Sequence, residues 1–148
     1  MKILQKICFV LLLLTTFQSA YAGDCIKDSD ADDCRVKAEQ GDAYAQYILG
    51  WMYKDGQGVL QDYKEAVKWY TKSAEQGIAL AQLNLGVMYY LGRGAPQDYV
   101  MAHMYFNIAA VSGGKEAIKF RGIVKKDMTT SQIERAQDLA REWMRTHQ

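Results

Sequence analysis

AEQGDAYAQYILGWMYKDGQGVLQDY at residues 38–63 and AEQGIALAQLNLGVMYYLGRGAPQDY at residues 74–99 decide the fold of this 148-residue chain. Extending the comparison without a gap, to residues 38–73 over residues 74–109, leaves 17 of 36 positions identical. Self-similarity at a fixed period of roughly 20–50 residues is typical of stacked repeat proteins. The sequence therefore predicts two tandem units of one supersecondary structure.

Each unit has the pattern of two α-helices joined by a glycine-containing turn. Apolar residues recur at steps of three and four, Gly56 and Gly58 interrupt them, and Asp62 is a suitable N-cap for the second helix. Gly77 follows that helix at the position where a positive φ favours glycine. The predicted helices span residues 43–54, 63–76, 79–91 and 99–112.

Two glycines lie within predicted helices. Gly50 and Gly86 occupy equivalent positions of the two units, and a glycine in a helix interior costs about 1 kcal/mol relative to alanine. We therefore expect a neighbouring helix to approach closely at both positions.

The repeat weakens towards both ends of the array. A first helix is predicted over residues 32–40, and a third copy keeps the register at Ala110, Gly113, Ala117 and Gly122 before the pattern is lost. A final helix over residues 130–145 begins with a capping box, either Thr129 with Gln132 or Ser131 with Glu134. Its apolar stripe suits a helix that covers the end of the stack. The stripe consists of Ile133, Ala136, Ala140, Trp143 and Met144.

The N-terminus has the three parts of a secretory signal. Lys2 and Lys6 precede an apolar run over residues 7–17, and Ala20-Tyr21-Ala22 forms a small-x-small cleavage site. An uncleaved anchor is the alternative, but a membrane span needs about 20 apolar residues. A lipid anchor is a second alternative, which the acidic residue before Cys25 disfavours. We expect cleavage after Ala22 and a periplasmic or secreted protein without membrane insertion.

Removal of the signal changes the charge balance. The chain has 18 Lys and Arg against 17 Asp and Glu, and the loss of Lys2 and Lys6 leaves 16 against 17, a net charge of −1. Nucleic-acid binding needs a basic surface stripe, so nucleic acid is not an expected partner.

Two cysteines, Cys25 and Cys34, remain after removal of the signal. Exported proteins meet an oxidising compartment, which predicts a disulfide between them. A structural zinc site is the alternative, but it usually needs four ligands, and His103 and His147 are distant in sequence. We expect no metal and no cofactor.

The sequence thus divides into five segments. They are the signal peptide at 1–22, an N-terminal segment with the first helix at 23–37, repeats at 38–73 and 74–109, and a degenerate third repeat with a capping helix at 110–148.

The repeated residues resemble the Sel1-like repeat family, a relative of the tetratricopeptide repeats. The family pattern A-x-A-Q-x-x-L-G-x-M-Y-x-x-G-x-G-V-x-x-D-Y-x-x-A-x-x-W-Y is present from Ala43 to Tyr70, and the second copy departs from it at Ala95 and at Tyr105-Phe106. The resemblance implies an all-α, right-handed α-solenoid of helix-turn-helix repeats with a C-terminal capping helix. It also implies an exported bacterial adaptor, regulator or inhibitor that acts through protein contacts.

A candidate partner surface follows from comparing the two copies. Identical positions are expected to build the scaffold, and the positions of the first helix that differ share one helical face. That face is rich in aromatic and apolar residues, which are frequent anchors of protein interfaces, although the same spacing is also typical of core residues. The predicted binding residues are Tyr44, Tyr47, Ile48, Trp51, Lys54, Leu80, Asn84, Val87 and Tyr90. The expected partner is a protein or peptide held by a monomer, and immunity to an exported toxin is a narrower form of this role.

A hydrolase acting on the cell wall or on β-lactams is the competing interpretation, because some cysteine-rich members of the family are described as β-lactamases. Ser112 and Lys115 fit the S-x-x-K pattern of serine–lysine enzymes. The serine must then begin a helix, whereas Ser112 is predicted to end one, and no K-T-G or S-D-N motif follows. The sequence therefore favours a binding protein without catalytic residues.

Overall fold

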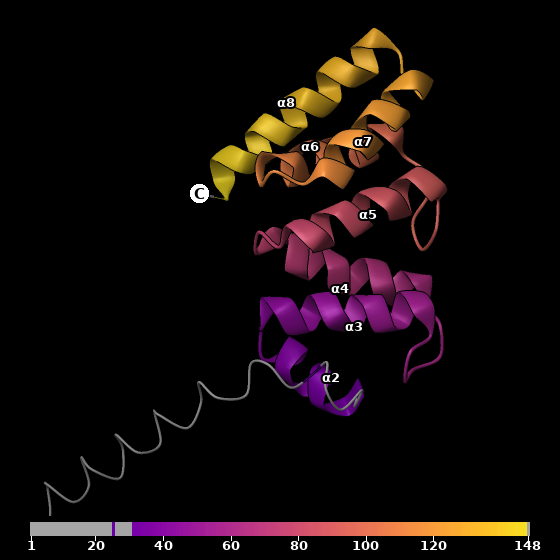
Figure 1. Ribbon diagram of the computed structural model, residues 1–148, viewed down its shortest axis with the longest axis vertical. Coiled ribbons are helices and arrows are strands. Elements are labelled where there is room, and N and C mark those ends of the chain that lie inside the picture. Colours follow the sequence, from indigo (N-terminus) through magenta and orange to yellow (C-terminus); the bar gives the residue numbers. More distant parts are fainter. Residues whose placement is uncertain (1–24, 26–30, 148) are drawn as a thin grey trace, which may run out of the picture.

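The computed structural model describes Cys25 and residues 31–147, and this part of the chain is helical, without strands. The predicted signal peptide, residues 1–22, lies outside the described residues. Successive helices stack from α2 at one end of the molecule to α8 at the other (Figure 1). The predicted α-solenoid is therefore confirmed. The elements are α2 (Ala31–Glu39), α3 (Ala43–Asp55), α4 (Tyr63–Glu75), α5 (Ala79–Leu91), α6 (Tyr99–Val111), α7 (Lys115–Val124), the 3₁₀ helix η1 (Lys125–Asp127) and α8 (Thr130–Thr146).

The repeated unit is a pair of packed helices, α3 with α4 and then α5 with α6. The first helices of the two pairs begin 36 residues apart, at Ala43 and Ala79, and so do the second helices, at Tyr63 and Tyr99. The predicted helix boundaries in both units agree with the structure to within a residue at each end.

The Gln-Asp pair that the two units share closes one helix and opens the next. The Gln61 amide Nε2 donates to the carbonyl oxygen of Lys54 at 2.8 Å, which satisfies a free acceptor at the end of α3. The Asp62 carboxylate accepts from two backbone N–H groups at the start of α4. Gln97 and Asp98 make the corresponding bonds in the second unit. Helix capping thus explains why the Gln-Asp pair is the same in both units.

A second repeated hydrogen bond joins neighbouring units. Buried Gln46 of α3 donates through Nε2 to the carbonyl oxygen of Ala38 in α2 at 3.1 Å, and Gln82 of α5 donates to Ala74 of α4 at 3.2 Å. Each glutamine therefore satisfies a carbonyl at the end of the preceding helix, in a place that water does not reach.

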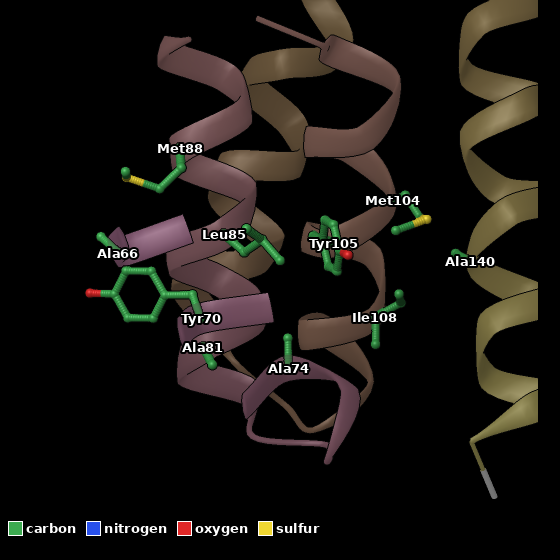
Figure 2. Packing of buried hydrophobic residues seen from close by; sticks show 10 residues of the cluster. All are labelled: Ala66, Tyr70, Ala74, Ala81, Leu85, Met88, Met104, Tyr105, Ile108 and Ala140. Atoms are coloured by element: carbon green, nitrogen blue, oxygen red, sulfur yellow. The ribbon is translucent and has the colours of Figure 1, made fainter. Parts of the chain in front are cut away.

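The central core joins four helices. Tyr70 of α4, Leu85 of α5 and Tyr105 of α6 belong to one buried cluster, and Figure 2 shows Leu85 pointing toward Tyr105. Ala140 of α8 belongs to the same cluster and is fully buried. Gly50 lies against the ring of Tyr70 and Gly86 against the ring of Phe106, which confirms the predicted close approach.

The C-terminal helix closes the array by packing on α6. Its capping box is formed by Thr129 and Gln132, the first of the two predicted pairs. Ala136 and Ala140 have no exposed surface, because small side chains let α8 lie close to its neighbour. The predicted third register is kept at Gly113, which lies between α6 and α7 and has a φ of 80°, as a glycine after a helix C-terminus does.

The predicted disulfide is not formed in this structure. Cys25 and Cys34 are both buried and both are free thiols, and the Cys34 Sγ donates to the backbone oxygen of Cys25 at 3.4 Å. Burial, followed by the hydrogen bond with Cys25, raises the pKa of Cys34 to about 12. The cysteine count indicated that the two residues lie together, but the contact between them is a thiol–carbonyl hydrogen bond.

Candidate protein-binding surface

A hollow with a volume of about 340 Å³ lies over α3, at the junction with α5 and with Cys25. Five of the nine predicted binding residues line it. The lining residues are Cys25, Tyr44, Tyr47, Ile48, Trp51, Met52, Gln57, Gly58 and Leu80. A pocket of this volume is at the lower end of the range for small ligands, roughly 300–1,000 Å³.

Three large apolar side chains around the hollow reach solvent. Tyr44 exposes 43% of its surface, Trp51 39% and Leu80 49%. Trp51 follows Tyr44 by seven residues on α3, so both stand on one face of that helix. Leu80 comes from the next unit. The stacking of the second unit on the first therefore creates an apolar rim that neither helix has alone.

Tyr47 and Ile48 form the inner part of the hollow. The Tyr47 ring lies 5.8 Å from that of Tyr44 and 6.0 Å from that of Tyr70, centroid to centroid, so it connects the surface to the core. Ile48 is 8% exposed and packs in the cluster between α2 and α3. Burial, and then the neighbouring Tyr44 and Asp55, raise the pKa of Tyr47 above its usual range. Its hydroxyl therefore stays protonated and able to donate a hydrogen bond.

The other four predicted residues lie away from the hollow. Lys54 pairs with Asp55 at the end of α3, and Asn84 donates back to the carbonyl oxygen of Leu80 within α5. Val87 and Tyr90 pack against the buried cluster of Phe106 and Val124, because α7 covers this part of α5. The nine predicted binding residues thus do not form one surface. Five line the hollow, and Val87 and Tyr90 lie where α5 packs against the third unit.

Sequence comparison of the two units missed four residues of the hollow. Met52 is identical in both units and was assigned to the scaffold, while Gly58 belongs to the turn and Cys25 to the predicted disulfide. Gln57 is replaced by Arg93 in the second unit. Extending the comparison from the helix to the turn would therefore have found Gln57.

The serine–lysine pair does not have the geometry of a nucleophile and its base. Ser112 is the C-cap of α6, and Lys115 is the first residue of α7. Both are exposed. Ser112 thus ends a helix, as predicted, instead of beginning one. Among the described residues, no group of three His, Cys, Asp or Glu side chains is arranged to hold a metal ion.

Comparison with known proteins identifies the repeat. The family model for the Sel1 repeat matches residues 43–78 and residues 79–113. Each match begins with the first helix of a unit and ends just after the second. No curated protein matches the sequence.

Two solved structures are similar to this chain. One is a protective antigen from uropathogenic Escherichia coli strains that displays an SLR fold; it is 33% identical, with a TM-score of 0.77 over 79% of this chain and 25% of that chain. The other is a Sel1 repeat protein from Oxalobacter formigenes, 41% identical, with a TM-score of 0.55 over 56% of this chain and 24% of that chain. This chain spans about a quarter of the length of each.

Proposed function

We propose that this chain, which belongs to the Sel1 repeat family, binds a partner protein through an exposed apolar side chain of that partner, which enters the hollow over α3. Sel1-repeat proteins generally mediate protein–protein interaction. The exposed apolar rim formed by Tyr44, Trp51 and Leu80 is the observation that carries the proposal.

The chemistry of the hollow favours a peptide segment with an aliphatic or aromatic anchor. Most of its lining is aromatic or aliphatic, and burial of such surface against a partner gains about 25 cal/mol per Å². The Tyr47 hydroxyl and the Gln57 amide supply polar groups that a peptide backbone needs. Two full repeats offer one short surface, so the partner is a single peptide or a compact domain. In this proposal the chain regulates or inhibits the protein that it binds.

Trp51→Ala is expected to weaken partner binding by at least about ten-fold, because truncation of a central aromatic anchor typically costs 2 kcal/mol or more. Trp51 is 39% exposed, so the loss of folding stability should stay near 1–2 kcal/mol, below that of a fully buried tryptophan. A photo-crosslinking amino acid in place of Tyr44 captures the partner, and the adduct is identified by mass spectrometry. Circular dichroism with urea measures stability.

Leu60→Ala is the matched control, since Leu60 is 90% exposed and does not line the hollow. The adduct formed at position 44 should be lost in Trp51→Ala and kept in Leu60→Ala. An adduct that persists in folded Trp51→Ala contradicts the proposed site. Unfolding of Trp51→Ala would instead assign Trp51 to the core, and Leu80→Ala, whose side chain is 49% exposed and also lines the hollow, then repeats the test with the crosslinker kept at position 44.

We also propose that the protein acts in the periplasm or outside the cell, on the basis of the signal at residues 1–22. None of the described helices is long and apolar enough to cross a membrane. Expression from the native start codon in a Gram-negative host should give a periplasmic protein whose first residue is Gly23, measured by intact mass. A cytoplasmic product that retains residues 1–22 contradicts this proposal.

A further inference from the structure

A second cavity, of about 430 Å³, lies at the opposite end of the array from α2, between α6, α7 and α8. Its walls include His103 and Asn107 of α6, Arg121 of α7, Lys125 of η1 and Gln137 of α8. All five side chains carry nitrogen or amide groups, and the lining contains no carboxylate. This composition contrasts with the aromatic hollow over α3.

The cavity exists because the third unit departs from the first two. In those units an aromatic ring of the second helix fills the space beside the mid-helix glycine, Tyr70 at Gly50 and Phe106 at Gly86. Gly122 holds the same register in α7, yet no side chain lies within 4 Å of the place where its Cβ would stand. The helix α8 packs on α6 instead, and a space remains between α7 and α8.

Two cations border this space without an acidic partner among the described residues. Arg121 donates through Nη1 to the Asn107 side-chain oxygen at 2.6 Å, which fixes the guanidinium at the wall of the cavity. Lys125 makes no ion pair with any part of the chain that the structure describes. Arg121 is half-buried and Lys125 is exposed, and like charges gathered at one concave surface raise the local concentration of counter-ions.

His103 adds a polar group that the fold leaves unpaired. The residue is only 2% exposed, and its Nδ1 is buried with no hydrogen-bond partner in the structure. Burial, and then the charges of Arg121 and Lys125, lower the pKa of His103 below its usual range. A neutral imidazole keeps one nitrogen that can donate and one that can accept a hydrogen bond, and the His103 ring forms part of the wall of the cavity.

We propose that this cavity binds a small organic molecule through an oxyanionic group, a carboxylate or a phosphate. Arg121 and Lys125 supply the charge, the Gln137 amide supplies a further donor, and the His103 ring forms part of the wall. Guanidinium groups are well suited to either anion, because their paired N–H donors match two oxygens at once. The volume of about 430 Å³ leaves room for an organic group beside the anion. The site is separate from the hollow over α3, and the proposal does not depend on that surface.

The test uses the full-length folded protein labelled with ¹⁵N and titrated with inorganic phosphate or with succinate at constant ionic strength in chloride. The expected result is a saturable set of NMR shifts confined to the cavity, including the His103 ring nitrogens and the amides near Arg121 and Gln137. Saturation by phosphate identifies a phosphorylated ligand class, and saturation by succinate identifies a carboxylate class. No saturable shift with either anion overturns the proposal.

Arg121→Gln should lower the affinity for the anion by at least about ten-fold. This is the change in dissociation constant expected for the loss of a charge-assisted hydrogen bond. Lys126→Gln is the matched control, because Lys126 is exposed in the same short element as Lys125 and does not line the cavity. The anion affinity of this variant should change by less than about two-fold, because an exposed charge away from the bound anion contributes little. Equal weakening in both variants shows general charge attraction and overturns the proposal. Lys125→Gln repeats the comparison if Arg121→Gln loses its dispersed spectrum.

Discussion

Gly94→Ala is expected to lower the free energy of unfolding by about 3 kcal/mol or more, the combined cost of a left-handed alanine and of overpacking. Gly94 has a φ of +75°, and a Cβ at this position would stand 2.1 Å from the carbonyl oxygen of Tyr63. Tyr63 is the first residue of α4, whereas Gly94 belongs to the turn after α5. Two backbones of neighbouring repeats therefore meet here, and no rotamer change relieves the clash.

Gly77→Ala separates the two costs. Gly77 also has a positive φ, +87°, but no atom lies within 4 Å of its ideal Cβ. This variant should lose only the conformational part, about 1–2 kcal/mol. Urea unfolding followed by circular dichroism measures both variants against the wild type. Equal losses for Gly94→Ala and Gly77→Ala would mean that the repeats separate slightly at Tyr63 without cost, which contradicts a rigid junction.

Gly86→Ala and Gly122→Ala should change stability in opposite directions, although the two glycines are in register and both are helical. A Cβ at Gly86 would stand 2.6 Å from a ring carbon of Phe106. That ring is 1% exposed and stacks on Phe120 at 5.5 Å, so it cannot move aside. Overpacking of about 3 kcal/mol exceeds the gain of about 1 kcal/mol in helix propensity. We expect a net loss near 2 kcal/mol.

At Gly122 the added Cβ meets open space, so only the helix propensity acts. The expected gain is about 0.5–1 kcal/mol, read as a higher midpoint of urea unfolding. Gly50→Ala, with Tyr70 at 2.7 Å, should behave as Gly86→Ala does. A destabilised Gly122→Ala would show that α7 already packs tightly at this position, and that the second cavity does not arise from a missing aromatic neighbour at Gly122.

Local chemistry made most of the helical architecture predictable from the sequence. Capping by Asp62 and Gln132 and the helix end at Gly77 depend on bonds between residues a few positions apart. These signals are complete within a short window, and the 36-residue period repeats them, so the helix boundaries could be predicted closely. The period also predicted which glycines meet a neighbouring helix, because both copies retain them.

The candidate sites were less predictable, because side chains from different units form them. Trp51 and Leu80 meet at one hollow only because the second unit stacks on the first, while Tyr90, another predicted binding residue, packs against the cluster of Phe106 and Val124. The spacing of residues along a helix predicts which face of the helix each side chain occupies. It does not predict which neighbouring helix packs against that face. The cysteine count likewise placed Cys25 beside Cys34 without fixing the bond between them.

The sequence by itself determined the repeat, its helices, their caps and the family, since each follows from residues close together in the chain or from their recurrence. Only the tertiary structure decided where α8 lies. By packing on α6, that helix leaves Gly122 without the aromatic neighbour found in the other two units. The position of a terminal helix depends on the balance of buried surface over the whole array, and no local pattern records that balance. The cavity around His103 and Arg121 is its consequence.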